Sequence, residues 1–121
     1  ICDGCGSGSR DLKFRHPAEE SAWEFLRANG HELLAHNFHA KFAEIDLITR
    51  DREGIIHIVE VKAYRGETHP LSAMTKEREN LMKKAAGVWM ATVGEREGIS
   101  SVTFDLLWVK EEGIETFQNL F

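Results

Sequence analysis

Three carboxylates and one lysine interrupt two apolar segments that otherwise have the composition of strands. Residues 43–62 read AEIDLITRDREGIIHIVEVK and contain Glu44, Asp46, Glu60 and Lys62. Carboxylate oxygens are the ligands that Mg²⁺ and Mn²⁺ prefer in proteins. A metal held by Asp46 and Glu60 would bind a water, lower its pKa and polarise a phosphodiester, while Lys62 would stabilise the charge that develops on the phosphate. The spacing therefore predicts metal-dependent phosphodiester hydrolysis.

The geometry of strands predicts how these side chains are brought together. Side chains alternate along a strand, so Glu44 and Asp46 share one face, and Glu60 and Lys62 share one face. A three-residue loop at 52–54, which contains a glycine, would close an antiparallel hairpin and would place Asp46 opposite Glu60 and Glu44 opposite Lys62. The apolar residues of the opposite face would be Ile45, Leu47, Val59 and Val61.

A fourth carboxylate is expected from a helix at residues 17–29. Pro17 suits the first helical turn and Gly30 suits the C-terminal cap. Glu19 precedes the apolar residues of this helix by three, four and seven positions, which places it on their stripe. We expect the helix to cover the ionisable face of the hairpin and to bring Glu19 to it. The stripe consists of Ala22, Trp23 and Leu26.

Such a cluster of acids needs positive charge. Carboxylates ~5 Å apart repel by about 3 kcal/mol per pair at an effective dielectric of ~20. Lys62 supplies one positive charge, and Mg²⁺, with Mn²⁺ as a substitute, would supply the rest. Without the metal, at least one acid should have a raised pKa. In the alternative interpretation Lys62 forms a salt bridge with Glu44, and Asp46 and Glu60 lie at a solvated sheet edge. The predicted catalytic residues are Asp46, Glu60, Lys62 and Glu19, and the predicted metal ligands are Asp46, Glu60, Glu19 and Glu44.

The remaining elements follow from periodicity and turn residues, and together they predict an α/β domain. Strands are expected at 31–40, 42–49, 55–64 and 102–109, a loop at 64–74 and a turn at 111–113, with a short apolar tail to residue 121. A second helix would begin after Thr75 as N-cap and end near residue 93. Its expected inner residues are Leu81, Met82, Ala85, Ala86, Val88 and Trp89. The residues expected to contact DNA phosphates are Lys41, Arg65, Lys76 and Arg78.

Composition limits the class of protein. The net charge of −5 excludes a protein that is basic all over, but it leaves room for a nuclease with a local basic rim. The chain of 121 residues fits one domain at 16–121, preceded by a flexible arm at 1–15. No apolar run approaches a membrane span of ~18 residues, so a cytoplasmic protein with no membrane partner is expected. Cys2 and Cys5 lie in the arm, and a zinc site there would need two further ligands, for instance His16 and His31.

Three other polar residues have structural interpretations. His57 occupies an odd position of its strand, so it should point away from the metal and lie partly buried. Asp105 interrupts an apolar strand and needs a partner such as a backbone amide or an arginine. His69 lies in the 64–74 loop, where it either contacts phosphate or is solvated.

These motifs resemble those of known nucleases. Asp46, Glu60 and Lys62 form the D…E-x-K pattern, which resembles the signature of the PD-(D/E)XK nuclease superfamily with its restriction-endonuclease-like fold. More closely, residues 16–118 resemble the YraN-like family, uncharacterised proteins that are grouped with Holliday-junction resolvases. The segments that carry this second resemblance are Glu19, AEIDLI at 43–48, VEVK at 59–62, Arg78 and TFDLLWV at 103–109.

The resemblance implies a central mixed sheet flanked by helices, a DNA endonuclease activity on structured or branched DNA, and homodimerisation, because resolvases cut two strands symmetrically. The family has glycine where this chain has Ala18 and Ala43, which matters because alanine replaces glycine well only where φ is negative. Two alternatives are a nucleic-acid-binding module that lacks catalysis and an interaction protein whose acids form only salt bridges. Metal binding and cleavage separate these three functions.

Overall fold

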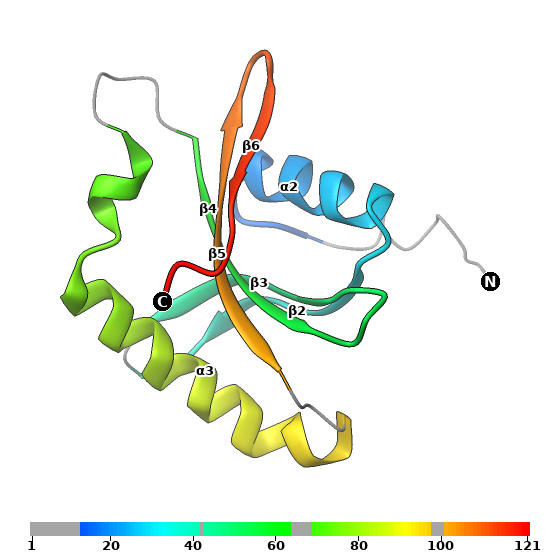
Figure 1. The fold of residues 1–121 in the computed structure, drawn as a ribbon, viewed down its shortest axis with the longest axis vertical. Helices are drawn as coiled ribbons and strands as arrows, with labels where there is room; N and C mark the ends of the chain where they lie inside the picture. Colours follow the sequence, from blue (N-terminus) through cyan, green and yellow to red (C-terminus); the bar gives the residue numbers. More distant parts are fainter. Residues whose placement is uncertain (1–12, 42, 64–68, 98–100) are drawn as a thin grey trace.

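The computed structural model describes residues 13–41, 43–63, 69–97 and 101–121 (Figure 1). Cys2, Cys5 and Arg65 lie outside these residues. The described elements are α2 (Pro17–Ala28), β2 (Glu32–His39), β3 (Glu44–Arg50), β4 (Ile56–Lys62), the 3₁₀ helix η1 (Pro70–Ala73), α3 (Lys76–Glu97), β5 (Val102–Lys110) and β6 (Gly113–Phe117). Each predicted strand is present, with ends that differ from the prediction by one or two residues.

The strands form one sheet in the order β2-β3-β4-β5-β6. Neighbouring strands are antiparallel except β4 and β5, which are parallel. A parallel pair needs a long crossover connection, and α3 lies in that connection. The predicted α/β fold, a central mixed sheet flanked by helices, is therefore confirmed, and its topology is consistent with the restriction-endonuclease-like fold.

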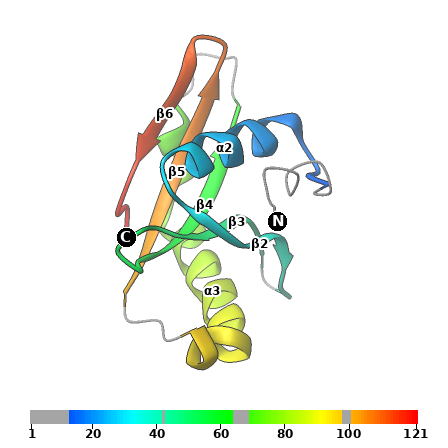
Figure 2. The same cartoon turned by 90° about the vertical axis from the view of Figure 1, so that its right-hand side faces the viewer.

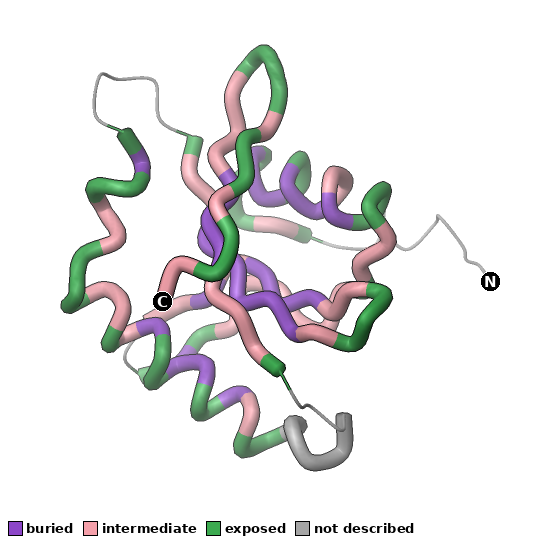
Figure 3. The backbone as a smooth tube through the Cα atoms, in the orientation of Figure 1, coloured by how far each residue is buried: buried purple, intermediate pink, exposed green. Residues whose placement is uncertain are grey.

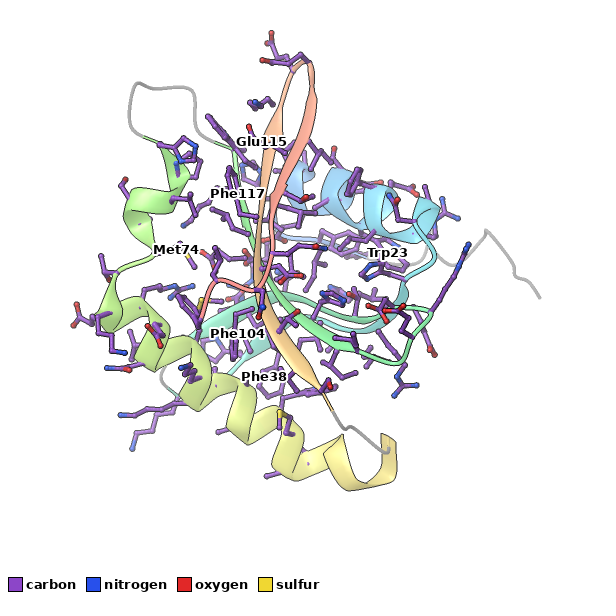
Figure 4. All side chains as sticks on the ribbon, in the orientation of Figure 1. Trp23, Phe38, Met74, Phe104, Glu115 and Phe117 are labelled. Atoms are coloured by element: carbon purple, nitrogen blue, oxygen red, sulfur yellow. The ribbon has the colours of Figure 1, made fainter. Side chains whose placement is uncertain are left out.

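The two helices cover opposite faces of the sheet (Figures 1 and 2). The buried residues lie along the middle of the strands and on the inner sides of both helices (Figure 3). Figure 4 shows Trp23 on the α2 side, and Phe38, Met74 and Phe104 on the α3 side. The α2 cluster comprises Ala22, Trp23, Leu26, Leu47, Val59 and Leu107. The α3 cluster comprises Ala40, Ile45, Ile48, Ile56, Ile58, Met82, Ala85, Ala86 and Trp89.

The assignment of α2 to the ionisable face of the hairpin is wrong. Its apolar side packs on Leu47 and Val59, which belong to the other face. Ile45 also departs from the prediction, because it packs in the α3 cluster and not beside Leu47. The change of face between these two residues of β3 coincides with Asn37 of the neighbouring strand. Asn37 has φ of 48° and lies between the β2 residues that pair with Leu47 and Ile45.

The second helix agrees with the prediction at its start and differs further along. The Thr75 Oγ1 accepts a hydrogen bond from the Arg78 N–H at 3.1 Å, which confirms Thr75 as the N-cap. Val88 was expected inside but is 43% exposed, because it lies about 100° around the helix from buried Trp89. Leu81 is half-buried, α3 continues to Glu97, and the predicted loop contains η1. Among the described residues, neither helix combines the length and apolarity needed to cross a bilayer.

Candidate active site

The candidate site lies where β3 and β4 separate. Their ladder ends at the pair Leu47 and Val59, although β3 continues to Glu44 and β4 to Lys62. Beyond that pair β3 stays paired with β2, and β4 stays paired with β5. We call the region of separation the fork and define it as residues 44–46 of β3 and 60–62 of β4.

The register of the hairpin is the predicted one. Leu47 pairs with Val59, so one further step along the two strands places Asp46 opposite Glu60. The backbone N–H of Asp51 donates to the Ile55 carbonyl at 3.0 Å, which leaves the predicted three-residue loop at 52–54. The observed register is therefore the expected one, but the ladder ends before Asp46 and Glu60, so the expected pairs of Asp46 with Glu60 and of Glu44 with Lys62 are not part of it.

Asp46 lies between the two separating strands. Its Oδ2 accepts a hydrogen bond from the backbone N–H of Val61 at 2.8 Å. Because the β3–β4 ladder has already ended at Val59, no backbone carbonyl of β3 pairs with this N–H, and the Asp46 side chain takes the place of that carbonyl. From this position the carboxyl group interacts with Glu19, which α2 presents from one face, and with Glu60 of β4. Glu19 and Glu60 are only 8% and 4% exposed. The fork thus brings three carboxyl groups from three elements together.

Burial raises the pKa of Asp46 to about 7, with the negative charge of Glu60 as the second cause. Glu19 adds to this rise through its charge and through a hydrogen bond between the two side chains, whereas the Val61 N–H acts in the opposite direction. The sequence predicts that at least one acid of this cluster has a raised pKa when no metal is bound, and Asp46 is that acid. Near neutral pH the Asp46 carboxyl is therefore divided between its protonated and its charged form.

Two cations of the chain neutralise Glu60. Its Oε2 lies 3.0 Å from the Lys62 Nζ, and its Oε1 accepts a hydrogen bond from an Arg78 guanidinium nitrogen at 2.8 Å. Arg78 lies in the first turn of α3, which the Thr75 cap holds. Arg78 was expected on a DNA-binding rim, and the structure places it directly against a site carboxylate.

Sequence reasoning missed Asn37, which joins two of the acids. Its side-chain amide donates to the Glu19 Oε1 at 2.9 Å and to the Glu44 Oε2 at 3.2 Å. The guanidinium group of Arg15 binds the other oxygen of Glu44, and the Arg15 backbone N–H donates to Glu19 at 3.2 Å. An asparagine within a strand was the available signal, since asparagine is depleted in strands and tolerates positive φ.

A cavity of about 350 Å³ opens over these groups. Its donor set of carboxylate oxygens fits a hard divalent cation in chemistry. As the side chains stand, no group of three or more His, Cys, Asp and Glu side chains in the described part of the chain is arranged to hold a metal ion. The oxygens are engaged with Val61, Lys62, Arg78 and Asn37 instead. The cavity is lined by His16, Ala18, Glu19, Asp46, Glu60, Val61, Lys62 and Ala63.

The other expected contact residues lie around this region in different ways. Lys41 is exposed in the connection from β2 to β3, at the same end of the sheet as the fork. Lys76 has a side chain that is 79% exposed and lies 3.4 Å from a Glu79 oxygen. His69 caps η1, since its Nδ1 accepts from the Leu71 N–H at 3.1 Å, and its ring packs edge-on against Trp108.

His57 and Asp105 form a separate buried cluster away from the fork. The ring nitrogens of His57 lie 2.5 Å from Asp105 and 2.8 Å from Asp51. Asp105 also accepts the Asn119 backbone N–H at 3.1 Å, so a backbone amide is confirmed as one partner, while His57 takes the place expected for arginine. Burial lowers the pKa of His57, but the hydrogen bonds and charges of the two carboxylates outweigh burial and raise it.

Ala18 and Ala43, where the resemblance implied glycine, are compatible with this backbone. Among the described residues that are not glycine, positive φ occurs only at Asn37 and Asn119. Ala18 and Ala43 therefore avoid the left-handed region, where a Cβ would be costly. Neither substitution prevents the arrangement of carboxyl groups at the fork.

Comparison with known proteins gives a family but no activity. The family model described as "Uncharacterised protein family UPF0102" matches residues 18–109, which include every fork residue. The chain is 34% identical to a UPF0102 protein of Campylobacter concisus, over 93% of this chain and 97% of the relative. It is 33% identical to one of Thermotoga neapolitana, over 86% and 94%, and 35% identical to one of Helicobacter pylori, over 85% and 86%. The chain belongs to the uncharacterised protein family UPF0102.

Proposed function

We propose that this protein is a metal-dependent endonuclease that hydrolyses phosphodiester bonds of structured or branched DNA. The observation that carries the proposal is the convergence of Glu19, Asp46 and Glu60 beside Lys62 in one cavity. Burial and mutual repulsion raise the pKa of Asp46 to about 7, which costs the folded state free energy whenever Asp46 is charged. Strongly perturbed acids in a cavity are a feature of functional sites.

The residues have distinct roles in this proposal. Asp46 and Glu60, with Glu19, would hold Mg²⁺ or Mn²⁺, which when bound lowers the pKa of water and polarises the phosphate. Asp46 gives up its proton near neutral pH, so a charged ligand is available there. Lys62 and Arg78 neutralise Glu60 when no DNA is present, and a phosphate at the cavity would compete for both cations. Their transfer to phosphate would release the Glu60 oxygens for the metal.

A second function has one specific observation in its favour. Both oxygens of Glu60 are paired with cations of the chain. A nucleic-acid-binding module without catalysis would retain these pairs when DNA binds.

The symmetric cutting of a junction would require two copies of the site, so the nuclease function at junctions includes a homodimer.

The test is cleavage of labelled four-way, flapped and linear DNA with Mg²⁺ and with Mn²⁺. Asp46→Asn and Lys62→Ala should abolish cleavage, because they remove a proposed metal ligand and one of the two cations paired with Glu60. Glu53→Gln is the matched control, since Glu53 is exposed in the loop at the opposite end of the hairpin and should leave cleavage unchanged. Binding of the same DNAs without metal and without cleavage would favour the non-catalytic module. No binding at all would contradict both functions.

A further inference from the structure

A second and larger cavity adjoins the one that contains the acids. It has a volume of about 560 Å³ and lies between the first turns of α2 and the tip of the β5–β6 hairpin, which extends beyond the rest of the sheet in Figure 1. His16, Ala18 and Ala63 line both cavities. A group held in the larger cavity would therefore be separated only by these three shared lining residues from a phosphate at Asp46, Glu60 and Lys62.

The lining of this cavity disfavours a phosphate. The backbone N–H of Ala18 donates to the His16 Nδ1 at 3.0 Å, that of Glu19 donates to the His16 carbonyl at 2.9 Å, and Pro17 has no N–H, so the first amides of α2 are already satisfied or absent. The Lys110 Nζ lies 3.0 Å from Glu115. The exposed side chains of Glu111 and Glu112 add negative charge to the rim.

The same lining suits a flat, uncharged group with polar edges. Trp108 lines the cavity, with the Lys110 Nζ 4.5 Å from the centre of its ring, and Pro17, Ala18, Ala63 and Val109 contribute apolar surface. Carboxylates such as Glu112 accept hydrogen bonds from the exocyclic amino groups of bases. The volume lies within the range of about 300–1,000 Å³ that is usual for cavities that bind small ligands.

We propose that this cavity binds an unstacked nucleobase of the nucleotide next to the scissile phosphate. The inference rests on the proposed nuclease function and specifies its substrate. Removing a base from a paired stack costs free energy, and the cost is smallest where the base is already unpaired. The preferred substrate is therefore DNA with an unpaired nucleotide beside the cleaved bond, as at a flap, a gap or a junction branch point.

The first test places 2-aminopurine at each position in turn around the branch point of a flapped DNA. Wild-type protein is used with EDTA, and DNA binding is followed in parallel by fluorescence anisotropy. Emission should rise several-fold at one position only, because 2-aminopurine is quenched by stacking. Bound DNA with no rise at any position would overturn the cavity proposal and would leave the nuclease function intact.

A filled cavity provides the matched variant. Ser21 is exposed and lines the larger cavity but not the one that contains the acids, so Ser21→Leu should remove the rise in emission while DNA is still bound. Ser101→Leu makes the same change at an exposed position next to the start of β5, at the far end of the sheet, and should behave as wild type. Retention of the full rise in Ser21→Leu protein would contradict the proposal.

The second test separates failure of the cavity from failure of the nuclease function. Free deoxynucleosides are titrated into ¹⁵N-labelled protein, and the three tryptophan indole signals are followed by NMR, with Trp108→Phe for assignment. Trp108 should shift, whereas Trp23 and Trp89, 6% and 4% exposed in the two cores, should not. No shift of Trp108 would contradict the base site. A shift of Trp108 in a protein that binds no DNA would support the base site and contradict the nuclease function.

Discussion

Asp46→Asn should stabilise the metal-free protein, and the gain should grow with pH. The substitution is nearly isosteric, and an amide oxygen can still accept the Val61 N–H while the amide nitrogen donates to Glu19. What changes is the charge. In the unfolded chain Asp46 loses its proton near its ordinary pKa of 3.8, but in the folded protein it retains the proton up to about pH 7. Wild-type stability therefore falls as pH rises through this window, because the folded state binds more protons than the unfolded state.

The size of the effect follows from the same two pKa values. One pKa unit corresponds to about 1.4 kcal/mol, so a rise from 3.8 to about 7 corresponds to about 4 kcal/mol of lost stability once Asp46 is charged. Asp46 is half-buried, and the water that reaches it reduces the expected gain from Asp46→Asn to about 1–3 kcal/mol above pH 7. Near pH 4 the gain should be close to zero.

The assay is urea unfolding in EDTA at pH 4, 5, 6, 7 and 8, with Glu53→Gln as a control for the loss of one exposed carboxylate. The same curves with Mn²⁺ form the second arm. A metal that binds only the folded state stabilises it, so wild type should gain from Mn²⁺ and Asp46→Asn should not. Equal destabilisation by Asp46→Asn at every pH would refute the inference that this carboxyl is strained in the folded protein. Equal stabilisation of both proteins by Mn²⁺ would exclude Asp46 as a ligand.

Two further predictions concern groups near and away from the fork. His57 lies between Asp51 and Asp105, which raise its pKa, so its contribution to stability is fully present below pH 6.5 and is lost as pH rises through the pKa of the folded state. NMR titration of its ring should give a pKa above 6.5. A value below 6.5 would contradict a charged histidine between the two carboxylates. Asn37→Gly should be more stable than Asn37→Ala by about 1 kcal/mol, because glycine tolerates the φ of 48° and both variants lose the amide. If urea unfolding showed Asn37→Ala to be the more stable of the two variants, the positive φ at this position would not disfavour a side chain.

The part of the site that lies within one hairpin could be predicted from the sequence. Side-chain alternation places Glu60 and Lys62 on one face, and a glycine-containing loop of three residues fixes which residues pair across the turn. These are local constraints, and the observed pairing of Leu47 with Val59 agrees with them. The helix containing Glu19 could also be predicted, because Pro17 and Gly30 mark its ends and one acid lies on its apolar stripe.

The parts that depend on tertiary packing could not be predicted in the same way. Alternation assigns one face to a whole strand, but Ile45 and Leu47 pack on opposite faces. The odd or even position of a residue along its strand also does not show which helix covers which face of the sheet. The contact of Arg78 with Glu60 depends on the packing of α3, and the contact of Arg15 with Glu44 joins residues 29 positions apart. No periodicity in the sequence encodes either contact.

The fork explains why carboxyl groups from opposite sides of a sheet can meet at all. A continuous ladder would separate α2 from the α3 face by a layer of hydrogen-bonded backbone, and Glu19 would not reach a residue on the far side. Separation of the strands opens that layer, but it leaves the Val61 N–H without a backbone acceptor on β3, and Asp46 provides the acceptor. Asp46 thus maintains the opening that it occupies. For this reason Asp46→Asn, which keeps the acceptor, tests the charge alone, whereas Asp46→Ala would remove the charge and a partner of the buried amide together.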